Sequence, residues 1–179
     1  MKPAFSDIGI VLRTVDFGEA DKLITIISHH HGMQDFIAKG ARRLNSKKAP
    51  HLDIFNQVKF QIGRGYTPQL LLQAETVQYY PQIKANFEKT RSAMLFCEIL
   101  NSLLPKEEDD KETYLSLTNF LSAINNSTNS KNNDDLINQF SLYLLRHLGY
   151  PAPKMLEAVS LPDYFETIIN KRLISQGLK

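Results

Sequence analysis

Cysteine is nearly absent from this chain of 179 residues, which holds only Cys97. A single cysteine excludes an intramolecular disulfide and a cysteine-based zinc site. Cys97 lies in an apolar run with helical spacing, where a buried, unreactive thiol is the usual outcome. Long apolar segments are absent too: no run approaches the ~18 residues of a membrane span, and the first residues lack the apolar core of a signal peptide. We therefore expect a soluble, cytoplasmic protein with no membrane partner.

The motifs of common enzyme chemistry are also missing. The sequence has no nucleophile elbow, no phosphate-binding Walker loop and no zinc-protease motif. His29, His30 and His31 are consecutive, but adjacent residues of an extended chain point to opposite faces, so the three cannot converge on one ion. A polar turn that ends at Gly32 is the better interpretation. The sequence predicts a protein that is not an enzyme and needs no metal or other cofactor.

Positive charge is concentrated in the first part of the chain. The formal net charge is only +2, but residues 1–80 hold ten Lys and Arg against seven Asp and Glu, whereas residues 81–179 hold eleven against twelve. Residues 39–48 alone hold five cations and no acid. Clustered Lys and Arg attract phosphates whatever the base sequence. On charge alone, a solvated loop without a ligand is an equal alternative.

Residues 1–81 have the alternating apolar pattern of β-strands. Strands are expected at residues 8–14, 23–28, 33–39, 58–62 and 70–77, with a polar loop at 15–21. The cation-rich residues 39–48 fall between the third and fourth strands, and we call this segment the basic loop. Five short strands with one long connection are typical of an OB-fold, a small Greek-key barrel that binds oligonucleotides and oligosaccharides. An SH3-like barrel has a similar strand count, but the long third connection favours the OB-fold.

Residues 82–179 change to helical spacing. Apolar stripes predict four helices, of which the first ends at Pro105 and the third ends at Gly149 and Pro151. Residues 125–133 are rich in Asn and Ser and predict a mobile loop. The fold class is therefore α+β, with an N-terminal five-stranded OB-fold over residues 1–81 and a C-terminal α-helical domain over residues 82–179.

Three further residues lie where an OB-fold meets its ligand. Arg64 and Tyr66 fall on the loop between the fourth and fifth strands, and Arg13 ends the first strand. A tyrosine there can stack on a base, a contact of roughly 1–3 kcal/mol. Packing of Tyr66 against the barrel is an equal alternative. The basic loop and this basic-aromatic loop fall within one small domain, which favours nucleic-acid binding.

The succession of motifs resembles the RecO family of bacterial recombination mediators. The matching residues are Ile10-Val-Leu-Arg-Thr14, Phe17-Gly-Glu-Ala-Asp-Lys-Leu23, His31-Gly32, Ala38-Lys-Gly-Ala-Arg-Arg43 with Ser46-Lys47, and Leu145-Arg-His-Leu-Gly-Tyr150 followed by Pro153. The similarity covers the barrel closely and the helical half loosely. It implies an OB-fold followed by a helical domain, with Gly18, Gly32 and Gly40 as turn residues that shape the barrel.

The resemblance also implies a function in DNA repair without catalysis. RecO proteins bind single- and double-stranded DNA, anneal complementary strands, and work with RecR and single-strand-binding protein to load RecA on gapped DNA, so we expect association with the nucleoid during repair. Many members carry a four-cysteine zinc module after the Leu-Gly-Tyr segment, and the residues after Pro151 contain no cysteine, so we expect no zinc. The residues expected to contact DNA are Lys39, Arg42, Arg43 and Lys47 by resemblance, Lys48 by its charge, and Arg13, Arg64 and Tyr66 by position.

Two other functions stay open at this point. The first is a protein-interaction adaptor whose helical domain binds a partner while the barrel is only a scaffold. The second is a general RNA-binding OB-fold protein. DNA affinity near zero at low salt would favour the adaptor, and a preference for RNA over DNA of equal length would favour the RNA-binding protein.

Overall fold

A computed structural model describes residues 3–63, 68–128, 130–151, 161–170 and 172–177 of the chain. The chain forms two compact units. The barrel unit comprises residues 1–79 and 104–115, and the helical unit comprises residues 80–103 and 116–179. Residues 104–115 therefore belong with the barrel although they lie far along the chain. The division into two domains at residue 81 stays a prediction.

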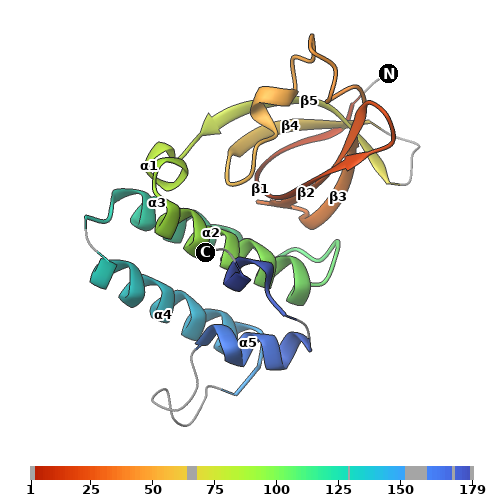
Figure 1. Cartoon of the computed structure of the whole chain (residues 1–179). Coiled ribbons are helices and arrows are strands. Elements are labelled where there is room, and N and C mark those ends of the chain that lie inside the picture. Colours follow the sequence, from red (N-terminus) through yellow and green to blue (C-terminus); the bar gives the residue numbers. More distant parts are fainter. Residues whose placement is uncertain (1–2, 64–67, 129, 152–160, 171, 178–179) are drawn as a thin grey trace. The chain divides into compact units, whose positions relative to one another are not determined.

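Five strands close into a β-barrel in the order β1-β2-β3-β5-β4 (Figure 1). Among the described strands of the barrel, β3 and β5 are the one parallel pair, through Phe36 with Gln69 and Ile37 with Leu70. Closure of the barrel leaves few unpaired strand edges. The prediction of an α+β fold with a five-stranded OB-fold barrel is confirmed. The strands are β1 (Pro3–Phe17), β2 (Asp21–Ser28), β3 (Gly32–Ala38), β4 (Gln57–Gly63) and β5 (Gln69–Gln78).

Apolar residues at alternate strand positions fill the barrel. On β4, Val58, Phe60 and Ile62 are at most 1% exposed, whereas Lys59 between them is exposed. This is the pattern expected of a strand with one face in the core, since successive side chains point to opposite faces. The outer face of β4 is therefore left to polar side chains.

The β1–β2 hairpin is longer than the sequence indicates. The predicted loop at residues 15–21 is wrong at both ends, because Val15 pairs with Leu23 and Phe17 pairs with Asp21. Only residues 18–20 form the turn. The hairpin end is polar and mostly exposed, so its composition resembles that of a loop. Glycines at three turns have the left-handed φ that favours this residue, as expected: Gly18 (59°), Gly32 (63°) and Gly40 (67°).

The basic loop between β3 and β4 is anchored in the barrel at both ends. Ala41 and Leu52 are 2% and 1% exposed and belong to the same core cluster as the strand residues. The short 3-10 helix η1 (Ala49–His51) lies just before Leu52. Beyond it, the Phe55 amide donates to the Val11 carbonyl at 2.9 Å, which joins the loop to β1. Residues 42–51 are thus raised on the barrel between two buried anchors.

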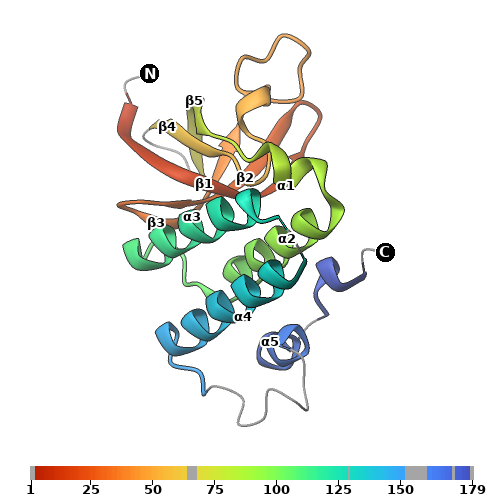
Figure 2. The same cartoon turned by 90° about the vertical axis from the view of Figure 1, so that its left-hand side faces the viewer.

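Helices make up the second unit, and α3 begins in residues that belong to the barrel unit. The helices are α1 (Pro81–Ala85), α2 (Phe87–Leu103), α3 (Lys111–Asn126), α4 (Ser130–His147), α5 (Leu161–Ile169) and the 3-10 helix η2 (Ile174–Gly177) (Figure 2). Phe96 of α2, Phe120 of α3 and Phe140 of α4 meet with ring centroids 4.7–4.8 Å apart. This aromatic contact holds the three helices together. No helix in the described part of the chain is both long and apolar enough to cross a bilayer.

The Asn-rich stretch is largely helical, so the prediction of a loop over residues 125–133 is wrong at residues 125–126 and 130–133, whereas residues 127 and 128 lie outside the helices. Helix α3 continues to Asn126 and α4 already begins at Ser130. Lys89 supports the end of α3, because its ammonium group donates to the carbonyls of Asn125 and Ser127, both at 2.9 Å. Asn and Ser are common both in loops and at helix ends, since their side chains bond to nearby backbone groups. Composition alone cannot separate the two.

Candidate nucleic-acid interface

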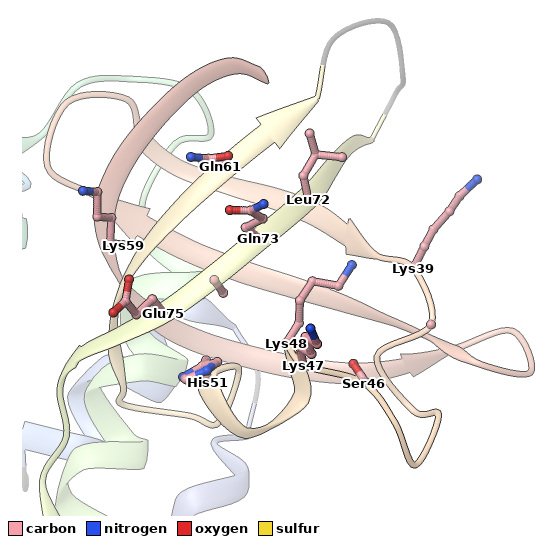
Figure 3. A pocket seen from close by; sticks show the side chains of 12 residues that line it. Lys39, Ser46, Lys47, Lys48, His51, Lys59, Gln61, Leu72, Gln73 and Glu75 are labelled. Carbon is pink, nitrogen blue, oxygen red and sulfur yellow. The ribbon is translucent and has the colours of Figure 1, made fainter. Parts of the chain in front are cut away.

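A hollow of about 820 Å³ lies on the outer face of β4 and β5, between these strands and the basic loop (Figure 3). Four lysines line it: Lys39, Lys47 and Lys48 from the loop and its start, and Lys59 from β4. We call this hollow the basic groove. Among the described residues that line it, Glu75 of β5 is the one acid, and it lies directly across from Lys59 in the β4–β5 pair. Cations thus outnumber acids four to one among the lining residues, and an anionic ligand is favoured.

Lys48 and His51 fasten the basic loop to β5. The Lys48 ammonium group donates to the Leu71 carbonyl at 3.1 Å. Burial lowers the pKa of Lys48, although the negative charge of Asp21 opposes this effect. On His51, Nδ1 accepts from the Thr76 amide at 3.1 Å. Because Nδ1 accepts this bond, the neutral imidazole carries its proton on Nε2. Both residues shape the groove wall in addition to lining it.

Arg42 bridges the basic loop to the β1–β2 turn instead of lining the groove. Its Nε lies 3.2 Å from an Asp16 oxygen, and its Nη1 donates to the Gly18 carbonyl at 3.1 Å. Its backbone amide donates to the Ala20 carbonyl at 2.9 Å. An exposed ion pair of this kind contributes roughly 0.2–1 kcal/mol. The guanidinium group mainly positions the loop, and we call these contacts the Arg42 bridge.

The other expected contacts are dispersed over the surface. Arg43 is exposed near the tip of the basic loop, outside the residues that line the groove. Arg13 lies on β1 near Asp35: burial raises the pKa of Asp35, but hydrogen bonds from Lys106 and Thr25 and the charges of Lys106 and Arg13 lower it overall. Arg13 therefore lies apart from the groove lining. Arg64 and Tyr66 lie outside the described residues.

Lys59 is a groove residue that the sequence interpretation did not select. The alternation around Val58, Phe60 and Ile62 predicts that Lys59 points outward, but not that it lines the same hollow as the basic loop. That relation depends on where the loop returns to the barrel. An outward lysine on a strand that directly follows a basic loop is the signal that finds it.

The three histidines form the turn between β2 and β3, as predicted. Two of them, His30 and His31, bond to a buried acid, Asp7. The Asp7 side chain is 1% exposed, and its two oxygens lie 2.8 Å from Nδ1 of His30 and 2.8 Å from Nδ1 of His31. The backbone amides of Ile8 and His30 donate to the same carboxylate at 2.8 and 3.1 Å. Burial acts to raise the pKa of Asp7, but these hydrogen bonds outweigh it and lower the pKa overall.

The cluster around Asp7 is an electrostatic support for the barrel. It joins β1 to the β2–β3 turn, and His31 also stacks on Phe5 with ring centroids 4.1 Å apart. Within the described ranges, no group of three or more His, Cys, Asp or Glu is arranged to hold a metal ion.

The fold and the groove together define a class of protein: an OB-fold barrel with a cationic groove on its outer face, joined to a helical unit. The chain belongs to the RecO family. The family profile described as "Recombination protein O N terminal" matches residues 1–80, and "Recombination protein O C terminal" matches residues 85–153. The resemblance seen in the sequence motifs is confirmed, and the family is one of DNA repair and recombination proteins.

Curated relatives carry the name "DNA repair protein RecO". The protein of Symbiobacterium thermophilum is 29% identical over 142 residues, which cover 79% of this chain and 55% of the relative. The Roseiflexus protein is 28% identical over 151 residues, or 84% of this chain and 52% of the relative. The Bifidobacterium adolescentis protein is 34% identical over 108 residues, or 60% and 44%. The chain spans about half the length of these relatives.

Proposed function

We propose that the chain is a DNA-binding recombination mediator in DNA repair, and that the basic groove holds the phosphate backbone. The observation that supports this most strongly is that four lysines, Lys39, Lys47, Lys48 and Lys59, line one hollow of the barrel. Phosphate contacts supply most of the sequence-independent affinity for DNA. A groove that reads only the backbone accepts both single and double strands.

The groove residues have different functions in this proposal. Lys39, Lys47 and Lys59 contact phosphates, and Arg43 extends the contact toward the loop tip. Lys48 and Arg42 hold the loop in place through their bonds to the Leu71 carbonyl and to Asp16. Arg13, Arg64 and Tyr66 stay predicted contacts beyond the groove.

Strand annealing follows from charge neutralisation without catalysis. Two complementary strands repel each other through their phosphates, and a bound cationic surface reduces that repulsion while it holds both strands close together. Base pairs then form spontaneously. Together with RecR and single-strand-binding protein, such a protein helps to load RecA on coated single strands. These partners are proposed because the chain belongs to the RecO family.

A salt titration of two matched double variants tests the groove. Lys47→Gln with Lys59→Gln removes two groove cations, and Lys111→Gln with Arg146→Gln removes two exposed cations that do not line the groove. On single strands the slope of log affinity against log salt is about −0.7 per neutralised phosphate. The groove variant is expected to lose about 1.4 from the slope and roughly 25-fold in affinity at 0.1 M salt. The control variant is expected to keep the wild-type slope.

Equal slopes for the two variants would show that the groove is not the DNA site. Changing Lys39, Arg42 and Arg43 together to Glu tests the loop in the same assay, and unchanged affinity would contradict its assignment. Competition with RNA of equal length separates a DNA-binding protein from a general RNA-binding one. Absence of DNA binding at low salt, together with tight binding to another protein, would favour the adaptor.

A further inference from the structure

The tip of the basic loop exposes a leucine. Leu44 has a relative exposure of 109%, so its side chain packs against nothing in the described structure. The surrounding turn is held by two backbone hydrogen bonds, from the Arg43 amide to the Gly40 carbonyl at 3.1 Å and from the Ser46 amide to the Arg43 carbonyl at 3.0 Å. Leu44 is therefore fixed in an exposed position, where its apolar surface has no function in folding.

A second apolar side chain is exposed at the end of the neighbouring hairpin. Phe17 is the last residue of β1 and is 48% exposed. Val15, two residues earlier and on the same face of the strand, is 37% exposed. Single exposed apolar residues are ordinary on protein surfaces. Phe17 is of interest because it lies close to the tip of the basic loop, where Leu44 is also exposed.

The Arg42 bridge brings these two side chains into one region. Arg42 bonds to the Gly18, Glu19 and Ala20 carbonyls, and it lies two residues from Leu44. Phe17 immediately precedes Gly18. With 3.8 Å between consecutive Cα atoms, the two tips lie within roughly 20 Å of each other. That length corresponds to about six stacked bases, at 3.4 Å per base along one strand.

Cations accompany the apolar tips. Arg43 precedes Leu44, and Lys39 and Lys47 lie on either side of the loop (the segment between Lys39 and Ser46 can be followed in Figure 3). Phosphates that gather at these cations bring their bases with them. In a single strand the bases are accessible to apolar side chains, whereas in a duplex an apolar wedge must first unstack them.

We propose that Phe17 stacks on an unpaired base and that Leu44 packs against a nearby base of the same strand, so that the loop tips favour single-stranded over double-stranded DNA. The inference rests on the proposed function, because it presumes that DNA binds this surface. It assigns to the tips a contribution that the groove lysines cannot make, since phosphates are common to both forms of DNA.

The test uses a double variant that combines Phe17→Ala and Leu44→Ala. Tyr79→Ala is the control variant. Tyr79 is 59% exposed and directly follows β5, at the end that pairs through Gln57 with Ile10, seven residues from Phe17 along β1. Affinity is measured for a single-stranded oligonucleotide and for a blunt duplex at several salt concentrations. The double variant is expected to lose 10-fold or more on the single strand, to keep its salt slope, and to change less than about two-fold on the duplex. Phe17→Tyr with Leu44→Met is expected to restore binding.

Several outcomes would overturn the inference. They are wild-type affinity of the double variant for the single strand, an equal loss on both forms of DNA, and an equal effect of Tyr79→Ala. If Lys47→Gln with Lys59→Gln still weakens binding in those cases, the proposed function survives without the tips. If the wild-type chain binds no DNA at low salt, the proposed function and this inference both fail. Thermal unfolding of each variant verifies that the fold is intact.

Discussion

Replacement of Asp7 by Asn tests how much the buried carboxylate stabilises the barrel. The carboxylate accepts hydrogen bonds from two imidazoles and two backbone amides. An amide has one acceptor oxygen instead of two, so the variant places a buried Nδ2 donor at position 7 opposite a group that also donates. Hydrogen bonds to charged groups contribute about 1.5–3 kcal/mol each, and an unsatisfied buried partner costs a similar amount. We expect a loss of about 3 kcal/mol in the free energy of unfolding.

The same variant has a defined pH dependence. The pKa of Asp7 in the folded state lies below its ordinary value of 3.8, because its hydrogen bonds outweigh the effect of burial. A lowered pKa stabilises the folded state at pH values above 3.8, and this contribution is lost as the pH falls through the folded-state pKa. Asn does not titrate in this range. The difference in stability between wild type and variant is therefore expected to be full at pH 5–7 and to shrink below about pH 3.8.

Urea unfolding followed by far-UV circular dichroism, repeated from pH 3 to pH 7, measures both effects. In thermal unfolding of a chain of this length, a loss of about 3 kcal/mol corresponds to a fall in Tm of roughly 6–12 °C. Asp109→Asn is the matched control, because Asp109 is exposed in the same unit and is expected to change stability by less than about 0.5 kcal/mol. If Asp7→Asn were as stable as the control at pH 7, or if its deficit stayed constant down to pH 3, the argument from the buried carboxylate would be wrong.

Two further predictions concern the barrel turn and the single thiol. Gly32→Ala is expected to destabilise the barrel by more than about 2 kcal/mol, because the residue has a φ of 63° and an added Cβ would collide with the backbone of Glu108. Gly18→Ala has a similar φ but open space, so in urea unfolding it should cost less, and equal losses would contradict the steric explanation. Burial raises the pKa of the Cys97 thiol far above its ordinary range, so a thiol reagent at pH 8 should modify Cys97 only in urea, and rapid labelling of the native protein would contradict its burial.

The strands were predictable because alternation is a local signal. Val58, Phe60 and Ile62 on β4 all face the core as their spacing predicts. The end of the β1–β2 hairpin was not predictable in the same way, because residues around Asp16 are exposed on both faces and have the composition of a turn. The prediction of a loop in the Asn-rich stretch was wrong for a related reason, because Asn and Ser are common both at helix ends and in loops.

The candidate site was predictable in charge but not in arrangement. The basic loop is visible as clustered Lys and Arg, whereas the roles of Arg42 and Asp7 depend on residues distant in the chain. Arg42 lies 26 positions from Asp16, and Asp7 lies 23 and 24 positions from its two histidines. These partners meet only because the strands between them pair in one register, and a register is a property of the whole barrel.

The residues that attach the basic loop to the barrel are distinct from the residues that it exposes to solvent. Ala41 and Leu52 are buried in the barrel core, while most side chains between them lie on the outside. Residues 42–51 can therefore be substituted without a change in the core of the barrel. Their charge and their apolar tip can vary without loss of core packing, because a surface loop between fixed ends has a closure cost that depends only weakly on its length. The surface that the barrel presents beside β5 can therefore change within ten residues, while the strands and their register stay the same.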